Sequence, residues 1–196
     1  MSARKLLSLP TMLFRRFVAA QHGIAAVEFA LFTPVFALLL AGIVDLGGAL
    51  YTKFKLDSAV TAGANYAQIN AGNVSSTNGQ TLATNIATIV ETSQGSGWAD
   101  DGVVVNDGPT ANVSSGTSSS GGTTANADVC YCPTSPSGVF TWGSSTICGA
   151  ACPGTNTGYA GKFVTITATH QYTPIFSSYG IVQNDAISTS AAVQVQ

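Results

Sequence analysis

Hydrophobic residues form one unbroken stretch near the start of the chain. From Phe29 to Val44 the sequence reads FALFTPVFALLLAGIV, without a charge, and the stretch extends back to Ile24 if Ile24–Glu28 is counted with its single acid. A helix needs about 20 apolar residues to cross the hydrocarbon core of a bilayer. A helix on the core of a soluble protein would show a polar face, which this stretch lacks. The pattern therefore predicts a membrane-spanning helix.

The helical pattern continues beyond this stretch. Apolar or small residues recur at offsets of three, four and seven, at Ala49, Leu56, Ala59, Val60, Gly63 and Ala67. They predict a single helix from about Ala25 to Ala71, ended by Gly72. Such a helix is roughly 70 Å long, more than a bilayer needs. Its outer half, residues 46–72, must therefore pack on a sheet or another helix, which its small side chains (Ala59, Ala62, Gly63, Ala64 and Ala67) would allow to approach closely.

The next part of the chain predicts a second helix and then a loop. Leu82, Ile86, Ile89 and Val90 share one helical face and follow the turn-rich Ser75–Gly79. The stretch from Asn106 to Asp128 consists mostly of Gly, Ser, Thr and Asn. Because Val113 is the only large aliphatic residue there, we expect 106–128 to be an exposed, mobile loop.

The C-terminal third changes to a period of two. Phe163–Tyr172 alternates apolar with polar residues, Ile187–Val195 does so more weakly, and both are typical of antiparallel strands with one covered face. Val103–Val105 and Asp128–Cys132 are candidates for shorter strands, and 173–186 is expected to be a loop. The order of elements predicts an α+β fold, in which a short helix and a small antiparallel sheet pack on the outer half of the long helix.

Charge is sparse and unevenly placed. Only 8% of the residues are charged, against about 25% in soluble globular proteins, which disfavours an ordinary cytosolic enzyme. Four cations lie near the N-terminus and no acid precedes Glu28, whereas three bases and eight acids follow Phe29. The acidic remainder offers no basic surface for nucleic acid. The positive-inside rule predicts a cytoplasmic N-terminus and an external position for everything after about Asp45. The four cations are Arg4, Lys5, Arg15 and Arg16.

The four cysteines lie in the part predicted to be external. Cys130, Cys132, Cys148 and Cys152 have the spacing C-x-C-x15-C-x3-C. Cysteines one residue apart rarely bond to each other, which leaves two pairings: 130–152 with 132–148, or 130–148 with 132–152. We expect the first, nested pairing because a hairpin-like loop would produce it. Zinc binding is the alternative, but the C-x-C spacing departs from zinc knuckles and an external compartment favours disulfides.

No arrangement of residues points to catalysis. The chain has two histidines, and it lacks G-x-S-x-G, H-E-x-x-H and a glycine-rich phosphate loop. His170 alternates within a predicted strand, so we interpret it as a surface or half-buried strand residue. Asp100-Asp101-Gly102 resembles a fragment of a calcium loop, but the other ligand positions are missing and a turn is the better interpretation. We therefore expect no cofactor, no metal and no catalytic residue.

The entrance of the apolar stretch carries a recognisable motif. A basic leader ends at Gly23, and Glu28 follows five positions later at the head of the apolar helix, which resembles the cleavage site of type IV prepilins. The fuller string, Gly23-Ile-Ala-Ala-Val-Glu-Phe-Ala-Leu with Pro34 and Gly42-Ile-Val-Asp45-Leu-Gly47, is similar to the TadE-like family, minor pilins or pseudopilins of tight-adherence (Tad) pilus systems. The resemblance covers about 23–67. It departs from the family's G-I-V-E-F string, in which this chain has Asp45-Leu46 in place of the usual Glu-Phe and so keeps the negative charge.

The resemblance implies a mechanism and a layout. A prepilin peptidase would cut between Gly23 and Ile24, and Glu28 would neutralise the new Ile24 amine in its own or an adjacent subunit. The implied parts are a cytoplasmic leader (1–23), a transmembrane helix (24–45), its extracytoplasmic continuation (46–72) and a periplasmic α+β domain (73–196). The implied partners are the peptidase, other Tad pilins, the inner-membrane assembly platform and membrane lipid, with the protein in the bacterial inner membrane and associated with a pilus.

Two other functions stay open at this point. The first is a secreted or surface protein whose Phe29–Gly48 segment is a conventional signal peptide, cleaved near Gly47-Gly-Ala49. The apolar core of this signal peptide would follow an unusually long leader with an acidic residue, Glu28, at its end. Signal peptides normally have neither feature. The second is a membrane-anchored periplasmic enzyme, for which no catalytic group is evident.

Overall fold

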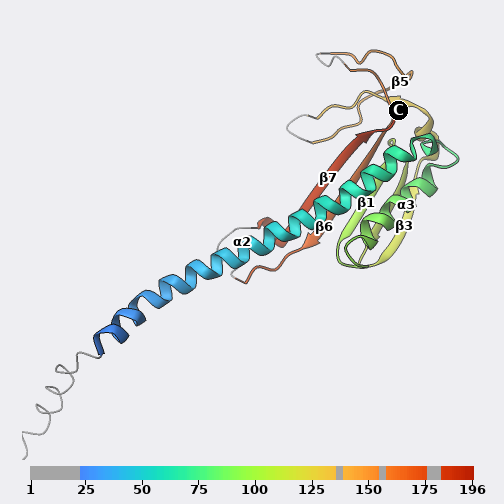
Figure 1. The fold of residues 1–196 in the computed structure, drawn as a ribbon. Helices are drawn as coiled ribbons and strands as arrows, with labels where there is room; N and C mark the ends of the chain where they lie inside the picture. Colours follow the sequence, from blue (N-terminus) through green and yellow to red (C-terminus); the bar gives the residue numbers. More distant parts are fainter. Residues whose placement is uncertain (1–22, 136–138, 155–157, 176–181) are drawn as a thin grey trace, which may run out of the picture. The chain divides into compact units, whose positions relative to one another are not determined.

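The computed structural model describes residues 23–135, 139–154, 158–175 and 182–196 (Figure 1). The chain divides into two units, one up to Asp45 and one from Leu46 to Gln196. Each unit is considered by itself below. The predicted leader, apart from Gly23, lies outside the described residues.

One long helix, α2, runs from Ile24 to Ile69 and confirms the predicted long helix, with both ends close to the expected positions. Pro34 lies inside it, and a short 3-10 helix, η2 (Ala71–Asn73), follows. The second helix, α3, spans Gly79–Thr92 and buries the predicted face through Leu82, Ile86 and Val90. Both helices therefore follow the hydrophobic period of the sequence.

The sheet has five antiparallel strands in the order β3-β2-β1-β6-β7 (Figure 1). Their bounds are β1 Asp100–Val105, β2 Pro109–Ser114, β3 Thr117–Gly122, β6 Phe163–Gln171 and β7 Ala186–Gln194. A second sheet pairs β4 (Cys130–Tyr131) with β5 (Ser145–Thr146). Two further 3-10 helices are η3 (Thr124–Asp128) and η6 (Gln183–Asp185). Long helix, short helix and antiparallel sheet together give the predicted α+β fold.

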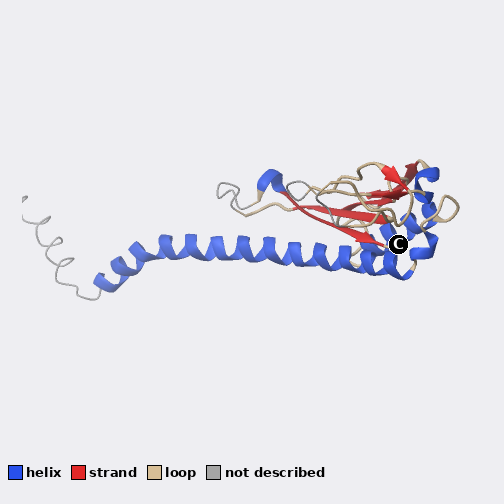
Figure 2. Cartoon of the chain, turned by 90° about the horizontal axis from the view of Figure 1, so that it is seen from above, coloured by secondary structure: helices blue, strands red, loops and turns tan. Residues whose placement is uncertain are grey.

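One face of the five-stranded sheet is covered by the two helices. The outer half of α2 runs along this face (Figure 2) and shares a single apolar core with α3 and the sheet. Its most deeply buried members are Leu56, Ile86, Val103, Val105, Val164 and Ile166. We call this the helix face, and the opposite face, which carries Asn112, Thr165 and Thr167, the open face. Alternation along the strands places every second side chain on each face.

Gly63 lies where α2 packs tightly against both α3 and β6. A Cβ at this position would lie 2.9 Å from Val90 Cγ2, 3.1 Å from Ile86 Cγ2 and 3.2 Å from Ile166 Cδ1. These methyl groups belong to α3 and β6, so one glycine permits contact with both elements. The prediction that small residues of α2 allow close approach is confirmed here.

The expectation of a mobile loop at 106–128 is wrong. The segment contains β2, β3 and η3, and it is held by turns in which Asn106, Asp107, Ser115 and Gly116 all have positive φ. Alternation in β2 buries Ala111 and Val113, and β3 needs no apolar residue because its backbone pairs with β2 along its whole length. Backbone hydrogen bonds from a neighbouring strand thus order a sequence too polar to order itself.

The Asp100-Asp101-Gly102 segment is also not a turn, because it begins β1. Asp101 faces the core and is 6% exposed. Neither of its carboxylate oxygens has a hydrogen-bond partner among the described residues. Burial raises the pKa of Asp101 to about 7, and the charges of Glu91 and Asp100 act in the same direction.

All four cysteines form disulfides, but the expected nested pairing is wrong. Cys130 bonds to Cys148 and Cys132 to Cys152, so the two bridges are staggered along the chain. The part of the chain between 130 and 152 is not a simple hairpin. Tyr131 pairs with both β5 and Gly161, which places Cys130 and Cys132 beside different segments.

Candidate functional site: the apolar entrance of helix α2

The predicted processing motif lies at the first residues of α2. Gly23 directly precedes the helix and is exposed, and a Cβ built on it would meet nothing within 4 Å. Ile24 is the first helical residue and is also exposed. The fold therefore places no constraint on the side chain at position 23, so any restriction there has to come from a binding partner.

Glu28 lies one helical turn after Ile24 and is exposed as well. Residues four apart in a helix are neighbours on its surface, so a carboxylate at 28 is within reach of a group at the head of the helix. The basic residues that the sequence places before Gly23 lie outside the described residues. Among the predicted processing and docking residues, the structure thus brings Gly23, Ile24 and Glu28 together at one end of α2.

The apolar residues that follow are exposed all around the helix. None of the side chains in the most apolar 18-residue window of α2 is buried. Large side chains that would normally avoid water have more than half of their surface exposed, among them Phe29, Leu31, Phe32, Val35, Phe36 and Leu39. In the part of the chain that the structure describes, α2 is the one helix long and apolar enough to cross a membrane, by length and composition.

Polar contacts fix the outer half of α2 to the sheet at the start of β7. Lys53 Nζ lies 3.1 Å from Asp57 Oδ1 and donates to the carbonyl of Ser188 at 3.0 Å. The hydroxyl of Thr189 donates to the Asp57 carboxylate. The Thr189 hydrogen bond and the Lys53 charge hold the pKa of Asp57 below its usual value. These contacts could not be predicted from the sequence, because Lys53 and Asp57 lie 135 and 132 positions before their partners and no local pattern connects them.

A stacked aromatic pair makes a second attachment. The Trp98 indole lies parallel to the His170 ring at a centroid distance of 4.1 Å, and Lys55 Nζ lies 4.4 Å from the centre of the Trp98 ring. His170 Nδ1 is also hydrogen-bonded to the Trp98 carbonyl. His170 is half-buried at the end of β6, as expected from its place in the strand. The cluster contacts α2, the segment before β1, and β6, and we see in it a structural role.

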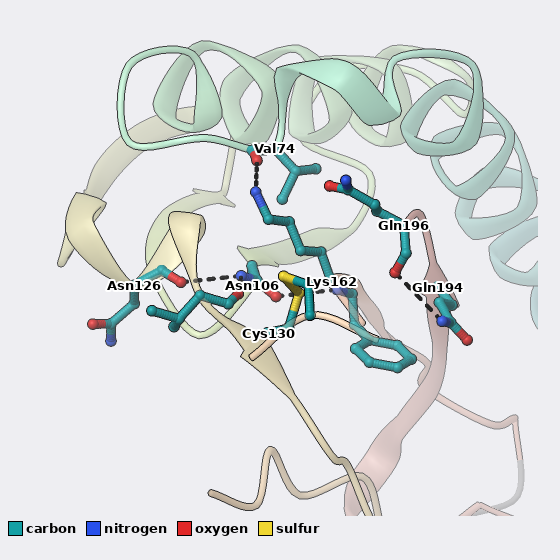
Figure 3. The surroundings of a disulfide bond; sticks show 10 residues. Val74, Asn106, Asn126, Cys130, Lys162, Gln194 and Gln196 are labelled. Carbon is teal, nitrogen blue, oxygen red and sulfur yellow. Dashed lines mark hydrogen bonds between the residues drawn. A yellow bond between two sulfur atoms is a disulfide. The ribbon is translucent and has the colours of Figure 1, made fainter. Parts of the chain in front are cut away.

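The disulfide-bonded region is joined to the core by two buried polar side chains (Figure 3). Lys162 Nζ donates to the carbonyl of Val74 at 2.8 Å. Asn106, which is fully buried, donates to the carbonyls of Asn126 and Val129 and accepts from the amide of Phe163. Val129 immediately precedes Cys130, so the first disulfide is anchored to the turn between β1 and β2. The Asn-Asp-Gly sequence at 106–108 was the available signal for this turn.

Comparisons with known proteins agree with the residues at this end of α2. A model of the TadE-like protein family matches residues 23–65. The resemblance predicted from the sequence is confirmed for this segment, which begins at the processing motif and ends within the outer half of α2. No curated protein and no solved structure matches the chain.

Proposed function

We propose that the protein is a non-enzymatic, membrane-anchored, pilin-like subunit that serves the assembly of a Tad-type pilus. The observation that carries this proposal is the exposed apolar first half of α2, which starts directly after Gly23 in the segment that matches the TadE-like family. Exposed aliphatic and aromatic side chains all around a helix require an apolar environment. A bilayer provides it before assembly, and the helices of neighbouring subunits provide it in a fibre.

Processing would take place between Gly23 and Ile24. A prepilin peptidase would remove residues 1–23 on the cytoplasmic side, including all four cations of the leader. The mature chain would start with an ammonium group at Ile24 and have Glu28 as the only charged side chain before Asp45. The exposure of Gly23 and Ile24 supports this step because a peptidase must reach both residues.

Glu28 would then act in subunit docking. An unpaired charge is costly in an apolar medium, and the Glu28 carboxylate can neutralise the Ile24 ammonium of its own chain or of an adjacent subunit. The other partners of this segment would be Tad pilins, the inner-membrane assembly platform and lipid. The unit from Leu46 onward would lie in the periplasm, in agreement with its two disulfides.

N-terminal sequencing and intact mass of the membrane-extracted protein test the processing step. The expected N-terminus is Ile24. An N-terminus near Ala49 would instead identify a conventional signal peptide and refute the pilin proposal. Gly23→Ala should be processed poorly and bulkier residues not at all. Because a side chain at 23 meets nothing in the fold, such a loss reports recognition by the peptidase and not misfolding.

The docking role of Glu28 is tested separately. Glu28→Ala should leave membrane insertion and processing intact, because it makes the segment more apolar, but should impair pilus formation. Glu28→Asp, which keeps the charge, is the matched variant and should retain part of the function. If Glu28→Ala cells make normal amounts of pili, the cleavage step stands and the charge-pairing mechanism falls. Tracking the protein in sheared filaments and in membranes shows whether it enters the fibre.

A further inference from the structure

Among the described residues, the five-stranded sheet has two unpaired edges, β3 and β7, at its opposite margins (Figure 1). Their sequences, TSSSGG and AISTSAAVQ, contain neither a charged residue nor a proline. Folded proteins normally block such edges with lysine, proline or a bulge because an open edge is a template for another strand. Both edges of this sheet therefore resemble docking surfaces more than protected margins.

The pairing pattern shows which backbone groups of β7 are free. The amide of Val195 donates to the Lys162 carbonyl at 2.9 Å, so odd-numbered residues of β7 face β6 and even-numbered residues face outward. Lys53 occupies the outward carbonyl of Ser188. In the part of the chain that the structure describes, the open part of this edge is therefore 190–194, where the backbone groups of Ser190, Ala192 and Gln194 point outward.

The same alternation defines the free edge of β3. The amide of Asn106 donates to the Phe163 carbonyl, so the backbone groups of even-numbered residues of β1 point toward β6 and those of odd-numbered residues point toward β2. The pairing of β1 with β2 and of β2 with β3 then makes the backbone groups of Thr117 and Ser119 point toward β2. The backbone groups of Ser118 and Ser120 consequently point outward. The length of β3, 117–122, is close to that of the open part of β7.

β3 adds nothing to the core. All six of its side chains are exposed, and serine and glycine are poor strand formers. Ordering the backbone of one residue costs about 1–2 kcal/mol, which burial does not offset in this strand. What β3 presents is a row of backbone donors and acceptors at the margin of the sheet.

We propose that β3 of one copy pairs with residues 190–194 of β7 in a second copy, so that the sheet continues from subunit to subunit. This inference rests on the proposed function, since subunits of one pilus or membrane have their α2 helices in the same direction. Within the unit from Leu46 onward, β7 starts beside Lys53 and Asp57 of α2, and the Lys162 segment that pairs with its end lies beside Val74, so β7 runs in the direction of α2. Its partner must then run in this direction too.

β3 meets this requirement. Because every neighbouring pair in the sheet is antiparallel, β3 and β7 run the same way. A parallel ladder sets an outward-facing residue of one strand opposite an inward-facing residue of the other. The backbone groups of Ser190 point away from β6, and those of Ser119 point toward β2, so the two residues can stand opposite each other in a parallel ladder. The side chains of both lie on the open face, so this pairing also continues each face of the sheet into the next copy. Two β7 strands related by a two-fold axis along the strands cannot form this ladder. Each residue would stand opposite its own copy, and the backbone groups of both would point the same way relative to their sheets.

Such a contact joins two different edges and leaves one of each free at the ends of the row. It is therefore heterologous and open, the kind of contact that generates a fibre or an extended array. Lys53 already occupies the outward carbonyl of Ser188, so an incoming strand cannot pair with β7 beyond that residue, and few registers remain possible.

Cysteine cross-linking in the full-length protein in its membrane tests the pairing. Described cysteines are all in disulfides, so an introduced cysteine is the reactive thiol. Ser119→Cys in one tagged copy should cross-link with Ser190→Cys or Ala192→Cys in a differently tagged copy. Asn112→Cys, exposed on the same face but one strand inward, is the matched control and should give at least tenfold less product. Three results would each overturn the proposal. They are the absence of a cross-link between the two differently tagged copies, a cross-link from Asn112→Cys as strong as that from Ser119→Cys, and a cross-link that forms only between two copies that both carry Ser190→Cys.

A proline test separates edge pairing from folding. Ser120→Pro removes an outward amide that β2 does not use, so the monomer should keep its disulfides while the mixed cross-link is lost. Ser118→Pro provides a second variant of the same kind. If either variant folds with full disulfide content and cross-links as strongly as the parent, edge pairing is refuted. Intact mass of the same samples reads the proposed function independently: cross-links without an Ile24 N-terminus would refute processing only, and an Ile24 N-terminus without cross-links would refute edge pairing only.

Discussion

Replacing Gly63 by alanine should destabilise the protein although it favours the helix. The added Cβ would lie 2.9 to 3.2 Å from three methyl groups, all carried by β-branched side chains of α3 and β6. Such side chains have little rotamer freedom, so α2 has to move away from two elements at once. Overpacking of this kind costs about 1–3 kcal/mol, while alanine in place of glycine gains about 1 kcal/mol within a helix. We expect a net loss of up to about 2 kcal/mol, the difference between these two effects, and a larger loss for Gly63→Leu.

The matched control is Gly47→Ala in the same helix, where a Cβ meets nothing within 4 Å. This change should be neutral or stabilise by up to about 1 kcal/mol, because only helix propensity is altered. Urea unfolding of the full-length protein in mild detergent, followed by tryptophan fluorescence, measures both variants. The reasoning about the packing of α2 is refuted if Gly63→Ala is as stable as Gly47→Ala, or if the order of the two is reversed.

Three further predictions concern the unit from Leu46 onward. The raised pKa of Asp101 means that the folded state favours its neutral form, so the contribution of Asp101 to stability should be largest at low pH and fall between about pH 4 and pH 7, by up to about 1.4 kcal/mol for each unit of the shift. In urea unfolding, Asp101→Asn should therefore lose less stability than the parent over this pH range. Cys132→Ser, which removes the bridge to Cys152, should cost about 2–5 kcal/mol and lower protein abundance without altering membrane insertion, as immunoblots of membrane fractions would show. Deleting most of 109–122 should prevent folding, because Ala111 and Val113 would leave the core, and a deletion variant with normal abundance and protease resistance would contradict this.

The helices could be predicted from the sequence because their apolar period is long and regular. Leu56 and Val60 in α2, like Leu82, Ile86 and Val90 in α3, repeat along a single face and are all buried as that period requires. The strands β6 and β7 were equally accessible from their alternation. The resemblance to the TadE-like family was recognisable because the residues that carry it lie close together in the sequence and needed no knowledge of the tertiary structure.

The remaining features depend on partners distant in sequence. β3 contains no hydrophobic residue, so no pattern could reveal a strand that exists through its pairing with β2. The Asn106-Asp107-Gly108 and Ser115-Gly116 turns were the local signals that would have indicated it. The choice between the two cysteine pairings that the spacing left open was beyond reach, because the segment around Tyr131 is paired with Gly161, which lies far along the chain.

The staggered disulfides constrain how the protein is made. In the proposed topology the cysteine-containing segment would cross the membrane from its N-terminal end, so Cys130 and Cys132 would become available first and Cys148 would follow. An oxidant acting in that order would join neighbouring cysteines before Cys152 arrives. Neither native bridge links consecutive cysteines. Correct maturation in that topology would require oxidation to wait until the whole segment has crossed, or a thiol–disulfide isomerase to exchange early bonds through mixed disulfides. Production hosts with oxidising but isomerase-poor compartments should accumulate scrambled, protease-sensitive chains.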